Sequence, residues 1–195
     1  MDTERDKVIL YSPQSKAVWQ ELQHIGIAYS RREYVEKKYG ESSGIFLTAY
    51  DEYIREAEKI VPRPDPRAYP YWAFASLEQL DVSGGGRLMT LSVPADEAVF
   101  FDQYDWYKVL RLSYIGENEQ DEKEFMLDLE RRGIKDPSEA VLRPFYPDIR
   151  RRISESWKRL FRHDAAIKMA IKNGDTPAVR AVQAGLWCIR EEWLI

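Results

Sequence analysis

Two adjacent aromatic residues, Tyr71 and Trp72, have side chains suited to binding a flat ligand. They lie in the aromatic run from Tyr69 to Ala75, which predicts a buried strand with aromatic side chains on both faces. Because a strand directs successive side chains to opposite faces, one of the two rings could stack on nicotinamide or a nucleobase. Packing of both rings in the hydrophobic core is the alternative interpretation.

A group of basic residues in the segment 150–162 is a second candidate. Part of this group falls on one side of a predicted helix, where guanidinium groups could meet phosphates. Surface pairing with nearby carboxylates is the competing interpretation, and the net charge of -4 argues against broad nucleic-acid binding. The basic residues are Arg150, Arg151, Arg152, Lys158, Arg159 and Arg162.

The remaining motifs favour structural roles. The glycine run 84–86 precedes a strand and lacks the Lys-Ser/Thr of a phosphate-binding loop, so it predicts a connecting turn. The acidic run 117–124 lacks calcium-loop spacing and predicts a solvated helix face. His24 and His163 have no nucleophile motif beside them, and Cys188 sits in an apolar segment typical of a buried thiol.

Composition narrows the class of protein. A chain of 195 residues suits one domain, 1–195, and the single cysteine excludes an internal disulfide and a structural zinc site of the Cys/His kind, so we expect no metal. The N-terminal residues have no apolar signal core, and no run of about 18 apolar residues could span a membrane. We therefore expect a cytoplasmic protein.

Helical spacing and proline and glycine positions predict the elements that carry these residues. Strands are expected at 8–12, closed by Pro13, and at 27–29, 69–75, 87–93 and 98–101, with a final strand inside 181–195. Helices are expected from Ser15 to Gly26 and over 31–38, 46–60, 103–110, 117–132, 149–161 and 165–172. The pattern predicts a single-domain α+β fold of short, mainly antiparallel strands surrounded by helices.

Several blocks of residues are similar to the bacterial domain-of-unknown-function family 3841. This resemblance covers most of the chain and brings no established activity. The blocks are Leu10-Tyr11-Ser12 with Val18-Trp19-Gln20-Glu21-Leu22 and Gly26-Ile27, then Tyr69-Pro70-Tyr71-Trp72-Ala73, then the segment 91–106, then Ser156-Trp157-Lys158-Arg159-Leu160-Phe161, and finally Val182-Gln183-Ala184-Gly185-Leu186-Trp187.

More distantly, the first and last blocks resemble ADP-ribosyltransferases, which would give the fold an ADP-ribosyltransferase-like character and NAD as the cofactor. The resemblance implies that Ser12 holds the NAD ribose and that Tyr71 or Trp72 stacks on nicotinamide. Gly185 falls where those enzymes carry a catalytic glutamate, and glycine cannot stabilise developing positive charge. Gln183 is then the remaining catalytic candidate, through a hydrogen bond to a ribose hydroxyl.

Three functional hypotheses follow, and whether the protein is an enzyme stays open. The first is a diverged ADP-ribosyltransferase-like domain that binds NAD or another nucleotide at Ser12, Tyr71, Trp72 and Gln183. The second is a non-catalytic interaction domain that binds a partner protein through the acidic helix at 117–130 or an exposed aromatic surface. The third is a nucleic-acid-associated protein that uses the basic segment 150–162.

Overall fold

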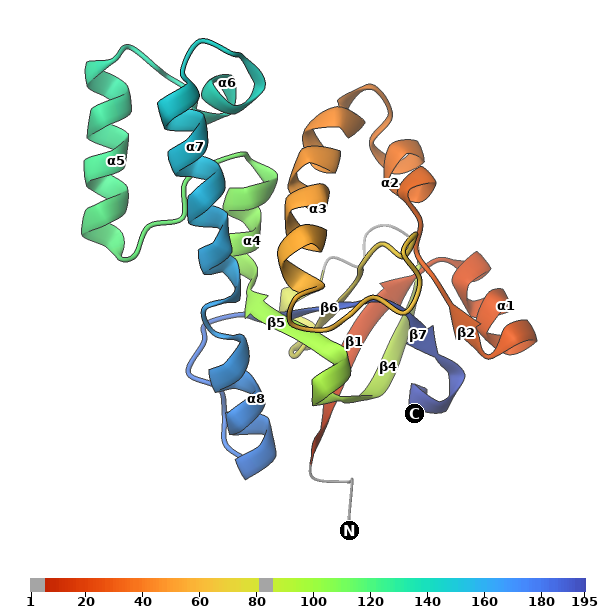
Figure 1. Ribbon diagram of the computed structural model, residues 1–195. Helices are drawn as coiled ribbons and strands as arrows, with labels where there is room; N and C mark the ends of the chain where they lie inside the picture. Colours follow the sequence, from red (N-terminus) through yellow and green to blue (C-terminus); the bar gives the residue numbers. More distant parts are fainter. Residues whose placement is uncertain (1–5, 81–85) are drawn as a thin grey trace.

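The molecule is built around a five-stranded antiparallel sheet, described here from a computed structural model of residues 6–80 and 86–195 (Figure 1). The strand order is β4-β1-β3-β6-β5, and a second, two-stranded antiparallel sheet joins β2 to β7. This arrangement confirms the predicted α+β fold with mainly antiparallel strands. The strands are β1 (Lys7–Gln14), β2 (Ile27–Ala28), β3 (Tyr71–Phe74), β4 (Arg87–Pro94), β5 (Ala98–Asp102), β6 (Val182–Leu186) and β7 (Ile189–Arg190).

Helices surround the sheet, and their ends follow the expected capping signals. Ser15 caps the first helix, where its side chain accepts a hydrogen bond from the Val18 amide, and Gly26 ends that helix in the left-handed conformation that favours glycine. The helices are α1 (Lys16–Ile25), α2 (Arg32–Tyr39), α3 (Ser43–Ala57), α4 (Gln103–Leu110), α5 (Glu119–Arg131), α6 (Pro137–Leu142), α7 (Pro147–Ser156) and α8 (Asp164–Asn173).

The sheet separates two hydrophobic cores. The larger core contains buried residues of α2 to α7 together with Val99 and Phe101 of β5, and we call the sheet surface toward it the α3 face. The smaller core contains buried residues of α1 and α8, and the sheet surface toward it is the α1 face. Because side chains alternate along a strand, β5 contributes to both cores, with Val99 and Phe101 in the larger and Ala98 and Phe100 in the smaller.

The structure corrects two expectations from the sequence and adds one helix. Pro13 does not close β1, because the strand continues to Gln14 and Pro13 is paired with Leu88 on β4. The expected helix over 149–161 is α7 followed by a 3-10 turn at Trp157–Phe161. The short helix α6, which begins at Pro137 after the cap Asp136, was not expected. Of the glycine run, only Gly86 lies within the described residues.

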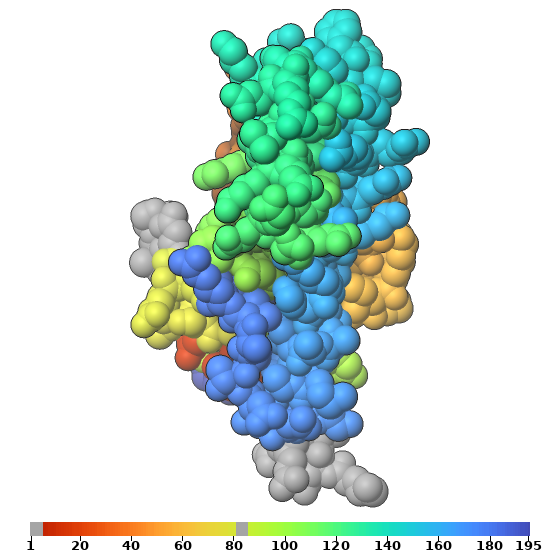
Figure 2. Space-filling view, turned by 90° about the vertical axis from the view of Figure 1, so that its left-hand side faces the viewer, coloured from red at the N-terminus to blue at the C-terminus, as the bar shows by residue number. Residues whose placement is uncertain are grey.

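The helices α5 and α7 are joined by ion pairs. Asp128 on α5 contacts Arg152 on α7 at 2.6 Å and also pairs with Arg132 at 3.3 Å. Arg132 in turn contacts Asp148 at 2.6 Å. Hydrogen bonding to Arg152 lowers the pKa of Asp128, and hydrogen bonding to Arg132 lowers the pKa of Asp148. These ion pairs join α5 to α7 in the upper part of the molecule in Figure 2.

We predict that the contribution of Asp128 to stability disappears in acid. A carboxylate with a lowered folded pKa stabilises the protein fully above its unfolded pKa of about 3.9 and loses that contribution as the pH falls through the folded value. Urea unfolding of the wild type and of Asp128→Asn from pH 7 to pH 2.5 measures it. The wild type should be more stable at pH 7, and the difference should shrink toward zero in acid. A difference that does not change with pH would contradict this assignment.

Candidate functional site

Ser12 is buried, and its hydroxyl forms hydrogen bonds within the sheet. It lies on β1, donates a hydrogen bond to the main-chain carbonyl of Trp72 at 2.7 Å, and accepts one from the Gln14 side chain at 2.8 Å. The side chain therefore ties β1 to β3. Its pairing with Met89, a member of the smaller core, places it on the α1 face of the sheet.

Trp72 packs among other aromatic rings on the α3 face. Its ring centroid lies 4.8 Å from that of Trp106 and 5.0 Å from that of Tyr53. The indole N–H donates a 2.7 Å hydrogen bond to the Tyr50 hydroxyl. With its faces and its polar atom engaged, Trp72 fits the core-packing alternative described from the sequence.

The other two candidates lie on opposite faces. Tyr71 belongs to the smaller core, on the α1 face, whereas Gln183 is paired with Phe101 of the larger core and lies on the α3 face. Both side chains are buried, and each has an oxygen without a hydrogen-bond partner among the described residues. The structure thus places Ser12 and Tyr71 on the α1 face and Trp72 and Gln183 on the α3 face, so the sheet separates these two pairs. Their roles toward NAD stay predictions.

The position expected to carry a catalytic glutamate is filled by a neighbouring side chain. A Cβ atom added at Gly185 would lie 1.9 Å from the Tyr53 hydroxyl oxygen and 2.8 Å from its Cζ atom. Both separations are far below van der Waals contact, so any larger residue requires Tyr53 to move. The Tyr53 hydroxyl is fully buried without a partner in the described part of the chain, and burial raises its pKa well above the ordinary value.

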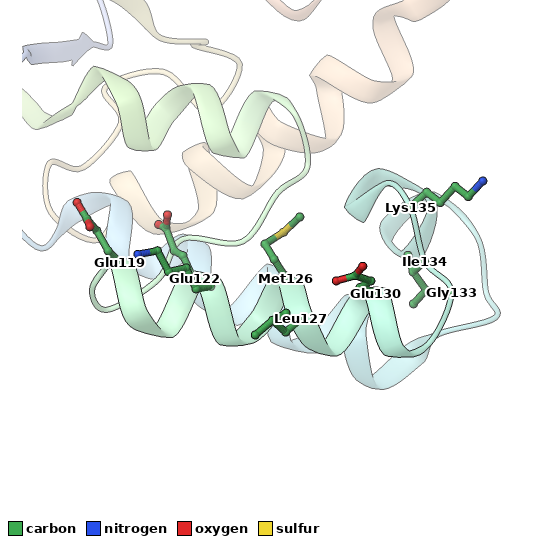
Figure 3. A pocket seen from close by; sticks show the side chains of 9 residues that line it. Glu119, Glu122, Met126, Leu127, Glu130, Gly133, Ile134 and Lys135 are labelled. Carbon is green, nitrogen blue, oxygen red and sulfur yellow. The ribbon is translucent and has the colours of Figure 1, made fainter.

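An open groove lies along α5, away from these strands. Its volume is 1020 Å³, and Figure 3 shows Met126 and Leu127 in the middle of the helix, with Glu119 toward one end and Glu130 toward the other. Met126 is 49% exposed and Leu127 is 48% exposed. The lining is completed by Glu122, Lys123, Gly133, Ile134 and Lys135.

Helical spacing explains why the groove exists and how the sequence could have indicated it. Phe125 and Leu129 are four residues apart, share one helix face and are buried in the larger core. Residues 126 and 127 are turned away from that face, so their apolar side chains meet solvent. This signal lay in the spacing of the apolar residues, whereas the prediction from the sequence rested on the acidic run 117–124 and described a solvated helix face.

Half of the basic group in the segment 150–162 forms ion pairs within the protein. Arg152 pairs with Asp128, Arg159 with Glu117 at 3.0 Å, and Arg162 with the buried Asp105 at 2.8 Å. Half of the six basic side chains therefore have carboxylate partners, which supports the interpretation as surface pairing. Over residues 6–80 and 86–195, no three histidine, cysteine or carboxylate side chains gather to hold a metal ion, and no helix is long and apolar enough to cross a membrane.

Comparison with known proteins places the chain in a family. The model of a domain of unknown function, DUF3841, matches residues 9–195, so the chain belongs to this family. This confirms the family resemblance noted from the sequence. No curated protein and no solved structure matches the chain. The function is therefore inferred from the fold and from the described surfaces.

We predict that Gly185→Ala destabilises the protein through contact with Tyr53. Overpacking of this kind costs about 1–3 kcal/mol. Tyr53→Phe alone should be neutral or stabilising, because it removes a buried hydroxyl without a partner. In the double variant the penalty for Gly185→Ala should shrink but persist, since the Cζ atom is retained. Urea unfolding of the four proteins gives the coupling free energy, and simple additivity would show that the two residues do not interact.

Proposed function

We propose that this protein is a non-catalytic interaction domain that binds a partner protein in the groove along α5. The observation that carries the proposal is the 1020 Å³ groove with Met126 and Leu127 half exposed on its floor. Exposed apolar side chains that line a concavity and are bordered by charged residues mark protein-binding surfaces. The proposal corresponds to the acidic-helix hypothesis drawn from the sequence.

The charge of α5 favours a basic partner segment. Six acidic and two basic residues lie in the helix sequence EQDEKEFMLDLER, and Asp121 and Asp128 are directed to contacts within the protein. Glu119 and Glu130 border the apolar floor at opposite ends. An amphipathic helix with apolar side chains at helical spacing and Lys or Arg beside them matches both features.

The apolar contacts should supply most of the binding free energy. Complete burial of a Met or Leu side chain is worth about 1.5–3 kcal/mol, so loss of one should weaken binding roughly tenfold or more. The charges at the ends of the groove contribute less to affinity and more to the association rate, and their effect should weaken with salt.

Selection from a displayed library of helical peptides tests this proposal with defined ligands. We expect selected peptides to carry apolar residues at i, i+3, i+4 and i+7 flanked by Lys or Arg. Fluorescence anisotropy should then show at least tenfold weaker binding to Met126→Glu and Leu127→Glu than to the wild type.

Met169→Glu is the matched control, because Met169 is also exposed on a helix, at 58%, but lies on α8. It should bind the peptides like the wild type. Equal binding by the wild type and both groove variants, or a library that yields no binder, would contradict the proposal. Circular dichroism of each variant checks that the fold is retained.

A second function, binding of NAD or another nucleotide by a diverged ADP-ribosyltransferase-like domain, is supported by one observation at its predicted site. The Tyr71 hydroxyl is buried with no hydrogen-bond partner among the described residues, as a group that awaits a ligand would be. The steric filling of position 185 by Tyr53 weighs against transferase chemistry there.

Calorimetry with NAD tests this second function. Binding that is lost in Tyr71→Phe and retained in Met126→Glu is expected if it is correct. No heat and no thermal shift at millimolar NAD would exclude it.

A further inference from the structure

Three buried polar atoms without partners gather near the two-stranded sheet. In the described part of the chain, such atoms include Nη1 of Arg31, Nε of Arg190 and the hydroxyl of Tyr71. All three are hydrogen-bond donors, and the two from arginine can only donate. A buried donor without an acceptor costs free energy, so this neighbourhood favours a species that accepts hydrogen bonds.

Strand pairing brings these groups together. Ile27 is paired with Arg190, and the alternation of side chains then places Tyr29 and Arg31 on the same side of the β2–β7 ribbon as Arg190. The Arg31 guanidinium lies 5.0 Å from the centroid of the Tyr29 ring. A main-chain hydrogen bond of 3.0 Å from Tyr69 to Ser30 brings the start of β3, and with it Tyr71, next to Arg31.

The electrostatics of the two tyrosines agree with this placement. Burial is the main cause that raises the pKa of Tyr71, the nearby Glu21 and Tyr34 raise it further, and the Arg31 guanidinium lowers it. Burial also raises the pKa of Tyr29, which Arg190 and Arg31 both oppose. Arg31 therefore acts on both hydroxyls, and Arg190 acts on that of Tyr29.

Each arginine also forms an ion pair with a carboxylate, through a nitrogen other than the one without a partner. Arg31 Nη2 contacts Asp65 at 2.9 Å, and Arg190 Nη2 contacts Glu97 at 3.1 Å. These pairs orient the guanidinium groups and offset their charge, so free donors rather than net charge would select a ligand. The Arg31 side chain is 26% exposed and that of Arg190 is 37% exposed, which gives the ribbon a connection to solvent.

We propose that Arg31, Tyr71 and Arg190 form a binding site for the phosphate group of a small molecule. Guanidinium and phenol donors in one neighbourhood match the several acceptor oxygens of a phosphate, and arginine contacts to phosphate are favourable and directional. The site is separate from the groove along α5 and does not rest on the partner-binding function. It adds Arg31 and Arg190, which the sequence did not single out, to the predicted ligand residue Tyr71.

Inorganic pyrophosphate is the probe, titrated into the full chain in a phosphate-free buffer at constant ionic strength. Thermal shift and calorimetry should show saturable binding by the wild type, with at least tenfold weaker binding to Arg31→Gln and Tyr71→Phe. The controls Arg111→Gln and Tyr104→Phe remove the same groups at exposed positions and should bind like the wild type. Should Arg31→Gln fail to fold, Tyr71→Phe still tests the site, because it deletes only a hydroxyl without a described partner.

The outcomes separate this site from both proposed functions. Absence of saturable binding, or equal binding by all variants, would overturn the site. Pyrophosphate binding without NAD binding would support the site and exclude the dinucleotide as its ligand. NAD binding unaffected by Arg31→Gln and Tyr71→Phe would place the nucleotide elsewhere and contradict the second proposed function at Tyr71, whereas the pyrophosphate titration decides this site. Peptide binding in the α5 groove should be the same with and without pyrophosphate.

Discussion

The contact between Tyr53 and the bare backbone of Gly185 is the constraint on which the centre of this structure depends. Tyr53 extends from α3 toward the sheet, with aromatic neighbours on several sides, and it reaches β6 only because position 185 has no side chain. The same contact would exclude a glutamate at position 185, where the expected resemblance to ADP-ribosyltransferases implied one. A glutamate and the ring of Tyr53 would compete for one volume. The neighbouring rings are Trp72, Phe101, Trp106, Phe161 and Trp187.

Much of the fold could be predicted because it is encoded by short-range signals. The capping serine and glycine around α1 and the alternation in β4 each depend on a few adjacent residues, so the sequence alone located those elements. The face to which each strand residue points depends on pairing between distant strands. Ser12, Trp72 and Gln183 do lie on three neighbouring strands, yet strand register decides that Ser12 faces one core and the other two face the opposite core.

The helix α5 shows how one amphipathic segment can have two uses. One face carries Phe125, Leu129 and Asp128 and is joined to the body of the protein by packing and by ion pairs with α7. The other face presents Met126 and Leu127 to solvent. Sequence reasoning described the helix as acidic and solvated because it weighed composition more than the angular position of each residue. Arg152, one of the basic residues that suggested phosphate binding, pairs with Asp128 on this helix.

The burial of Cys188 makes the reactivity of its thiol a measure of how often the C-terminal ribbon opens. The side chain is 3% exposed beside β7, and burial raises the pKa of its thiol, so the reactive thiolate is scarce while the ribbon is closed. It is also the one cysteine of the sequence. Its rate of alkylation therefore measures how often the C-terminal ribbon separates from the body of the protein, without any engineered label.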